Sequence, residues 1–322
     1  MTSLFWALRR VLVALLTLVA VSILIFGAVR LLPGSYTDLV LGPLASEEAR
    51  QAAMEQLGLN DSVFVQYLTW IQAAVSGDLG TSFVSGVSIS DEFTARMPVT
   101  VTIAAFAAVL TVVLGIPLGF FTATRSRAGN AGAIGRIVSA LGISIPEFVL
   151  GGLVVYVVST FAVGLRIGQY ESLASDPAAF FSSLVLPTLV LSVFCIAVTA
   201  RTTRDAVMNV LVEPHVTAAV ARGEAPWFIV RHHVARNAMI PILTLTATII
   251  ASLLGGTVIV ETIFDVPGLG SYLVTALGRR DYAIVQAGAL LATAVFIVSS
   301  AAIDILATAV DPRLRQDKGT SA

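Results

Sequence analysis

Few side chains in this sequence could do chemistry, and the histidines among them lie in one stretch. His215, His232 and His233 are the three histidines of the chain, and imidazole is the commonest metal ligand in proteins. Neighbouring residues point to different faces of a helix, so His232 and His233 are poorly placed to share an ion. No cysteine or acidic cluster accompanies them, and the single Cys195 lies in an apolar run. We therefore expect no bound metal and no disulfide within the chain.

Two acidic residues interrupt otherwise apolar runs. Glu147 follows Pro146 about ten residues into its run, and an acid at the bilayer centre costs about 2.5–3.5 kcal/mol on insertion scales. Glu147 is therefore expected to face the protein interior or to be protonated. In the interior it either lines a polar pathway or pairs with a polar group on a neighbouring helix. Asp304 lies near the end of its run. There we expect a role at the helix end or a pair with Arg201 or Arg204.

Nucleotide hydrolysis would need a phosphate-binding loop of the form G-x-x-x-x-G-K-[ST], whose lysine contacts phosphate. Lys318 is the only lysine, and it precedes Gly319 and Thr320 without the required earlier glycines. No apolar run pairs a nucleophile with a base either. We therefore expect that the chain is not an enzyme and holds no cofactor of its own.

The composition places most of the chain in a membrane. Of its 322 residues, 57% are hydrophobic and 12% are charged, against about 25% charged in a soluble protein. A span needs about 20 apolar residues and must be helical, because a lone strand leaves its backbone unsatisfied in lipid. Six runs qualify, which predicts an all-α polytopic protein with six transmembrane helices. The runs are Val11–Val29, Val99–Thr124, Ile137–Leu165, Phe180–Ala200, Ala238–Val260 and Ala283–Val310.

The positions of the basic residues predict the orientation. With the N-terminus inside, the inner segments hold 13 basic residues and the outer segments hold 6, as the positive-inside rule requires. Both termini are then cytoplasmic. The predicted parts are a cytoplasmic N-terminus (1–10), a first transmembrane helix with a structured extracytoplasmic segment (11–98), a transmembrane core (99–310) and a cytoplasmic tail (311–322).

The residue pattern of the extracytoplasmic segment predicts two helices. The first covers SEEARQAAMEQLG and is closed by Gly58; the second begins at the capping residue Asp61 and ends at Gly77. One face of the second helix is expected to pack against the spans, since its members recur at helical spacing. That face comprises Val63, Tyr67, Trp70, Ile71 and Ala74.

A polar stretch between the fourth and fifth runs predicts a helix, a glycine and a second helix. Glu213 and Pro214 favour a helix start, and Gly223 favours a left-handed helix end. Pro226 begins the second helix, and Pro241 marks entry to the fifth span. The small residues Ala218, Ala219 and Ala221 would let a partner surface approach closely. The alternative is an amphipathic hairpin lying on anionic lipid.

This stretch resembles the cytoplasmic loop of ABC importer permeases, whose pattern is EAA, three residues and then glycine. Here Thr217, Ala218, Ala219 and Gly223 occupy that register, with Thr217 at the position of the acid. Further stretches resemble the dipeptide/oligopeptide subfamily, first-permease type, over nearly the whole chain. They are Leu8–Gly34, Gly58–Phe83 with its GDLG-x-S ending, Leu114–Phe120, Gly142–Gly151, Arg231–Leu243, Gly255–Gln286 with E-x-x-F-x-x-PG-x-G and RDY, and DPR at Asp311–Arg313.

The resemblance implies a type I ABC importer permease fold in a bacterial cytoplasmic (inner) membrane. It implies that residues 205–237 form a coupling loop, which docks on a cytoplasmic ATPase. The loop residues to which this role is carried over are Glu213, His215, Thr217, Ala218, Ala219, Arg222, Gly223 and Pro226. The candidates for the pathway or its gate are Pro146, Glu147, Glu261, Phe264, Pro267 and Gly268. At Glu147 the family commonly has a small polar residue. For the block around Glu261, plain loop structure is the alternative.

The implied partners are a homologous second permease, two ABC ATPase subunits that bind ATP and Mg, an extracytoplasmic solute-binding protein, the lipid bilayer and a peptide substrate, with no nucleic acid. The same machinery could instead import nickel chelates, haem-like compounds, glutathione or oligosaccharides. A secondary transporter or channel would need charged relays in several spans or repeated halves. The sequence has two membrane acids and no visible repeat.

Overall fold

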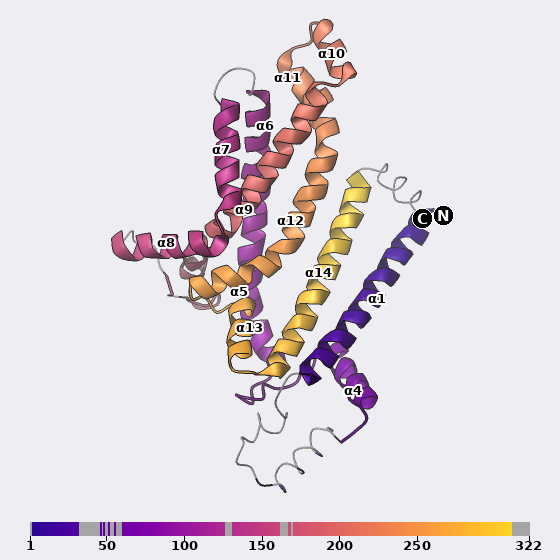
Figure 1. The fold of residues 1–322 in the computed structure, drawn as a ribbon, viewed down its shortest axis with the longest axis vertical. Helices are drawn as coiled ribbons and strands as arrows, with labels where there is room; N and C mark the ends of the chain where they lie inside the picture. Colours follow the sequence, from indigo (N-terminus) through magenta and orange to yellow (C-terminus); the bar gives the residue numbers. More distant parts are fainter. Residues whose placement is uncertain are drawn as a thin grey trace. The chain divides into compact units, whose positions relative to one another are not determined.

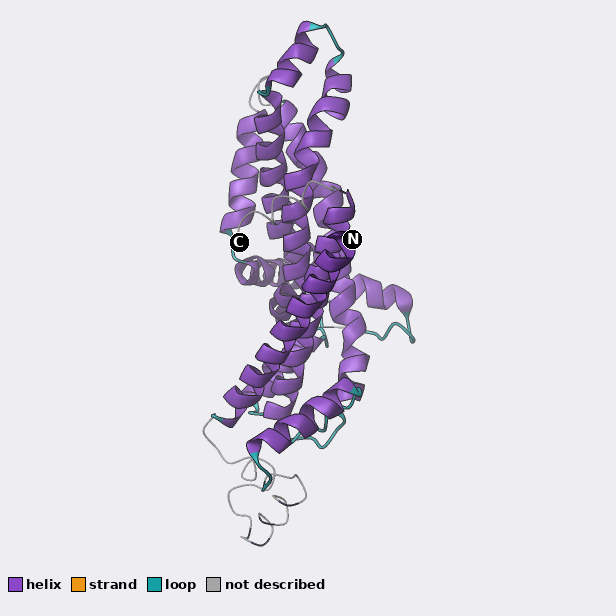
Figure 2. Ribbon diagram, turned by 90° about the vertical axis from the view of Figure 1, so that its right-hand side faces the viewer, coloured by secondary structure: helices purple, strands orange, loops and turns teal. Residues whose placement is uncertain are grey.

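The computed structural model describes residues 2–31, 60–125, 131–161, 167–168 and 170–310, with residues 46, 48, 51 and 55. The described part is helical and contains no β-strand, which confirms the all-α prediction (Figures 1 and 2). In chain order its elements are α1 (Thr2–Arg30), α4 (Val63–Val75), α5 (Ile89–Leu110), the π-helical η1 (Thr111–Gly115), α6 (Ile116–Thr124), α7 (Ala131–Ser144), α8 (Glu147–Phe161), α9 (Pro177–Leu211), α10 (Pro214–Ala221), α11 (Pro226–Phe228), the π-helical η2 (Ile229–Val234), α12 (Ala235–Ile263), α13 (Leu269–Gly278) and α14 (Tyr282–Val310).

Five helices are long and apolar enough to cross a membrane, at five of the six predicted runs. They cover Val11–Arg30, Ile89–Thr124, Pro177–Leu211, Pro226–Leu253 and Tyr282–Ala301. The chain is therefore a polytopic membrane protein, with six spans if a bent pair of helices counts as one.

That bent pair replaces the continuous helix expected over Ile137–Leu165. Helices α7 and α8 meet at an angle of 94°, around Ile145 and Pro146 (Figure 1). Proline disfavours the helical conformation of the residue before it, and it has no N–H to continue the helical hydrogen bonds. Residues 162–165 of the predicted run lie outside the described residues.

The chain divides into two compact units, residues 1–100 with 267–301 and residues 101–266 with 302–322. The core of the first unit joins the start of α5 to α13 and α14, through Ile89, Phe93, Ala276, Ile284 and Ala287. These positions lie far apart in sequence. Residues 1–100 and residues 267–301 therefore fold together, although residues 101–266 separate them in the sequence.

Helix α4 of the first unit packs on α1, as its apolar face predicted. The Tyr67 hydroxyl lies 2.8 Å from the Ser22 hydroxyl, and the Tyr67 and Phe26 ring centroids are 5.3 Å apart. Val63, which was expected on this face, is exposed. The helix is capped by Ser62, whose side chain accepts from Val65 N–H, and not by Asp61. Nearly all of the helix predicted over 46–58 lies outside the described residues.

The second unit is built around α9, which packs against α6, α7, α8 and α12. Glycine permits the closest approach. A Cβ added at Gly119 of α6 would lie 2.4 Å from Thr203 Cβ and 2.6 Å from the Ala200 carbonyl oxygen. In a membrane, such small residues let helix backbones pack directly on one another. The backbones of α6 and α9 are therefore closer than any side chain at position 119 allows.

We predict that Gly119→Ala separates α6 from α9 and lowers the thermal unfolding midpoint of the purified protein, because overpacking costs about 1–3 kcal/mol. The matched control is Gly152→Ala in α8, where an added Cβ meets no atom within 4 Å. Both changes gain helix propensity, so the difference between the two midpoints isolates the packing term. Equal midpoints would contradict this account.

Candidate functional site

The candidate site is the hairpin, defined as residues 213–237, which joins α9 to α12. Glu213 has the extended backbone of a helix N-cap before α10, and Gly223 takes φ +76° at the turn. Both features agree with the prediction. The second arm starts at Pro226 and continues through η2 into α12 without a break. Pro241 therefore does not separate a second helix from the fifth span, but lies inside α12, since neighbouring helices and local π-helical geometry accommodate proline in membrane helices.

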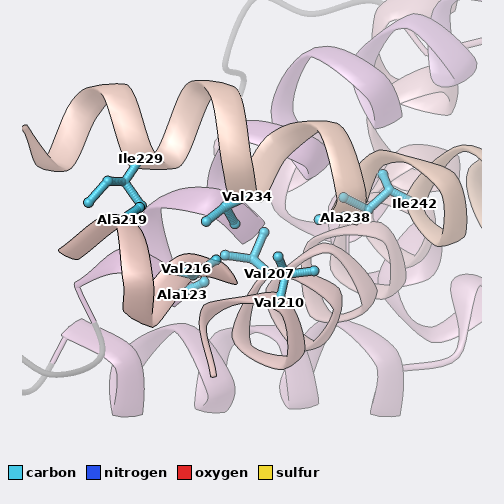
Figure 3. Close-up of a cluster of buried hydrophobic side chains, with 9 residues drawn as sticks. All are labelled: Ala123, Val207, Val210, Val216, Ala219, Ile229, Val234, Ala238 and Ile242. Carbon is cyan, nitrogen blue, oxygen red and sulfur yellow. The ribbon is translucent and has the colours of Figure 1, made fainter. Parts of the chain in front are cut away.

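The two arms of the hairpin enclose a hydrophobic cluster that continues into the membrane helices (Figure 3). Val216 and Ala219 of α10 lie against the end of α9 and against η2. The cluster comprises Ala123, Val207, Val210, Val216, Ala219, Ile229, Val234, Ala238 and Ile242. Ala219 is 0% exposed, so the expectation that it meets a partner surface is corrected. Its small side chain serves close packing inside the chain, whereas Ala218 and Ala221 are exposed.

Glu224 holds the turn of the hairpin. Arg222 donates to Glu224 Oε1 from Nε at 2.9 Å and from Nη2 at 2.6 Å, and His233 Nε2 lies 3.0 Å from Glu224 Oε2. The hydrogen bond from Arg222, followed by that from His233, lowers the pKa of Glu224 below its usual value of 4.5. The carboxylate therefore connects the turn to η2.

His215 makes a second connection between the arms. Its Nδ1 lies 3.1 Å from Glu213 Oε2, and its Nε2 lies 3.2 Å from Asn237 Nδ2. Asn237 also donates to the His233 carbonyl at 3.1 Å. His215 and His233 are thus structural residues of the hairpin. Within the described residues, no three side chains of the metal-ligating types come together.

The outer edge of the hairpin exposes apolar side chains. Trp227 is 71% exposed, and Val220 and Phe228 are also exposed. Phe228 stacks on His232 with ring centroids 4.1 Å apart. Six of the predicted loop residues are also exposed, namely Glu213, Thr217, Ala218, Arg222, Gly223 and Pro226. Trp227 and Phe228 are not among the predicted loop residues, and their exposure adds them to the candidate surface.

Glu147 lies at the start of α8, directly after the bend, and is half-buried. Its Oε2 approaches α12 so closely that a Cβ added at Gly256 would lie 3.8 Å away. The same added Cβ would lie 3.0 Å from Leu191 Cδ1 of α9. The carboxylate therefore lies close to α12 and to Leu191 of α9, while the adjacent Pro146 is exposed.

The four remaining candidates, predicted for a gate, fall in different units. Glu261 and Phe264, in the second unit, are 0% and 2% exposed, so both are packed inside the single chain. In the first unit, Pro267 is half-buried and Gly268 is buried. Gly268 is the N-cap of α13, whose first amide, that of Leu269, donates to Thr100 Oγ1 at 2.9 Å. Glu261, Phe264 and Gly268 are therefore buried within their own units.

Asp281 of the first unit is a buried acid that sequence analysis did not single out. Ser82 donates to its Oδ2 at 2.5 Å, and the backbone amides of Phe83 and Val84 lie 3.3 Å from its oxygens. Ser82 belongs to the GDLG-x-S motif and Asp281 to the RDY motif, so the Asp281 carboxylate connects the two motifs. The bond fixes the loop before α5 against the start of α14.

We predict that acid loosens the hairpin through Glu224. Because its folded pKa is lowered, the stabilisation is present above the unfolded pKa and is lost as pH falls through the lower folded pKa. Hydrogen exchange of the α10 amides, corrected for intrinsic rates, should show protection that falls below about pH 4.5. Glu224→Gln should show weak protection at every pH. The control is Glu171→Gln, which changes an exposed residue outside the hairpin. A pH-independent wild-type profile would contradict the role of the carboxylate.

Comparison with known proteins agrees with this architecture. Residues 115–316 match the family described as binding-protein-dependent transport system inner membrane component, and residues 3–104 match the N-terminal model of the same system. A probable peptide ABC transporter permease protein of Sinorhizobium fredii is 34% identical over 96% of this chain and 99% of its own length. The glutathione transport system permease proteins of Escherichia coli and Salmonella choleraesuis are each 34% identical, over 96% of this chain and 98% of theirs. The chain therefore belongs to the binding-protein-dependent transport system inner membrane components, as an ABC importer permease of the peptide family that crosses the cytoplasmic membrane several times.

Proposed function

We propose that this chain forms part of the translocation pathway of an ATP-driven importer of di- and oligopeptides, and that its hairpin couples the pathway to cytoplasmic ATPases. The observation that carries the proposal is the construction of the hairpin. Its second arm continues into α12 without a break, its first arm, α10, follows directly after the turn that ends α9, and the hydrophobic cluster extends from α10 to Ile242 of α12. A force applied to α10 is therefore transmitted to membrane helices through packed side chains.

The roles of the loop residues follow from their positions. Thr217, Ala218 and the exposed apolar residues Val220, Trp227 and Phe228 present the surface that an ATPase subunit contacts. Ala219 supports this surface from beneath. Glu213 and His215 hold the first arm, and Arg222, Gly223 and Pro226 shape the turn. ATP and Mg bind to the ATPase subunits, which are separate proteins in this family.

The remaining partners are a homologous second permease, with which this chain encloses the pathway, and an extracytoplasmic solute-binding protein that delivers the cargo. The distribution of basic residues supports a cytoplasmic hairpin and cytoplasmic termini. Peptide cargo is supported by the names of two kinds of relative, one a probable peptide permease and the other a glutathione permease. Glutathione is itself a tripeptide.

Glu147 is proposed to line the pathway and to meet the amino group of a peptide. Its half-buried position between α8, α9 and α12 supports this role, because an acid held at membrane depth needs a polar or cationic neighbour. Glu261, Phe264, Pro267 and Gly268 are proposed to act on gating indirectly. They would set the ends of α12 and α13 rather than touch cargo.

The coupling proposal predicts that Gly223→Trp abolishes uptake of labelled di- and oligopeptides while the chain still inserts in the membrane. A tryptophan disfavours φ +76° and would crowd the docking surface, whereas Gly223→Asn should retain most uptake because asparagine tolerates the left-handed region. Cells lacking the gene, complemented with wild type or each variant, provide the measurement.

Normal uptake by Gly223→Trp would reject the coupling role. Peptide uptake that is unaffected by deletion would reject the peptide cargo. Nickel chelates, haem-like compounds, glutathione and oligosaccharides would then be tested with the same strains.

The pathway proposal predicts that Glu147→Gln changes the KM for peptides of different charge unequally, with cationic peptides affected most. The loss of one charge–charge contact is worth about 1.5–3 kcal/mol at a buried site, so KM for a cationic cargo should rise about tenfold or more. Copurification of the ATPase and second permease should be unchanged. Identical kinetics for cationic, neutral and anionic peptides would show that Glu147 does not contact cargo.

A further inference from the structure

The second unit contains a cationic cavity that the transport function does not use. It has a volume of about 260 Å³ and lies between α7 and α9. Arg136 and Ser139 line it from α7, and Arg201, Arg204 and Asp205 line it from α9. Three arginines and one aspartate are therefore among the residues that line the cavity.

Among the described residues that line the cavity, positive charges outnumber negative charges by three to one. Arg204 Nη1 lies 3.1 Å from Asp205 Oδ1, which neutralises one of the three arginines. The Arg204 side chain is 16% exposed, and its buried Nε has no hydrogen-bond acceptor among the described residues. A buried N–H without an acceptor is costly. Arginine forks bind phosphate oxygens well, because several donors meet several acceptors.

The depth of the cavity matches the surface of a bilayer. The apolar run of α9 ends at Ala200, so Arg201 and Arg204 are the first charged residues beyond it. The helix continues past them to Leu211. In the orientation proposed above, the cavity lies at the headgroup level of the inner leaflet, on the membrane side of the hairpin.

By helical spacing, the exposed apolar residues of α7 lie on the other side of that helix from the cavity. Ile134, Ile137, Val138 and Leu141 are all more than half exposed, whereas Gly135, Arg136, Ser139 and Ala140 line the cavity. The choice of a lipid headgroup over a free phosphate ion therefore depends on the position of the cavity, directly beyond the apolar run of α9.

We propose that this cavity binds the headgroup phosphate of an anionic phospholipid. Basic pockets between transmembrane helices on the cytoplasmic side are suited to such headgroups. The lipid would bridge Arg136 of α7 to Arg201 and Arg204 of α9. It would thereby fix α7 beside the helix that leads into the hairpin. The site is independent of the cargo, and only its assignment to the inner leaflet depends on the proposed orientation.

The test uses the assembled transporter in mild detergent, mixed with phosphatidylglycerol or phosphatidylcholine, and native mass spectrometry to count bound lipids. Phosphatidylglycerol should bind and phosphatidylcholine should not. Arg204→Gln and the more exposed Arg136→Gln should each weaken phosphatidylglycerol binding about tenfold, from the loss of a charge-assisted hydrogen bond. The matched control is Arg125→Gln, which removes an exposed arginine that lies over the Phe121 ring and outside the cavity.

Several results would overturn the proposal. One is equal binding of the two lipids, and another is unchanged phosphatidylglycerol binding by both cavity variants. Displacement of the lipid by an equimolar amount of inorganic phosphate would assign the cavity to a soluble anion instead. Loss of the ATPase from the purified complex with lipid binding intact would assign the arginines to a protein contact. Because lipid binding is measured without cargo, a failed peptide-uptake experiment leaves this result interpretable.

Discussion

The burial of one face of α10 between the extensions of α9 and α12 is the interaction on which the rest of the second unit depends. Val216 and Ala219 fill this space, and the fit is close enough that a larger residue than alanine at position 219 would push α10 outward. The same apolar cluster continues to Ile242 in α12. The hairpin is therefore not a loop attached to the membrane helices but their packed end. The hydrogen bonds of Glu224 and Asn237 fix the relative rotation of the two arms. The buried apolar surface, however, comes from the hydrophobic cluster.

Hydropathy was sufficient to predict five membrane helices and the helical fold, because backbone satisfaction in lipid leaves few alternatives. The ends of α10 were also predictable, since Pro214 and Gly223 act through local backbone geometry. The bend at Pro146 was not predicted, although the proline was visible. A proline in a membrane helix can produce a slight kink or a complete break, and neighbouring helices decide between them. For the same reason Pro241, which was expected to mark the start of a span, lies inside a continuous helix.

The sequence also could not distinguish which small or polar residues face a partner and which face the chain itself. Ala218 and Ala219 are adjacent and identical in type, yet one is exposed and the other buried, because helical rotation relative to α9 is a tertiary property. The bond between Ser82 and Asp281 joins residues 199 positions apart. Each motif was visible alone, but no local pattern indicates the pairing. Glu261 was expected near a gate and is fully buried, which a count of charged residues near span ends does not reveal.

The right-angled bend between α7 and α8 has a consequence for how the protein is made. Helix α7 has 14 residues and α8 has 15, so each is about 21–23 Å long, shorter than the hydrocarbon core of about 30 Å. Neither helix is therefore long enough to cross that core alone. At the bend, Ile145 donates to the Leu141 carbonyl at 3.1 Å and Val149 donates to the Pro146 carbonyl at 3.0 Å, so the bend is compatible with paired backbone groups. Helix α8 packs against α9 and α12, so the contacts that hold α8 in its bent position come from a part of the chain that is synthesised after it.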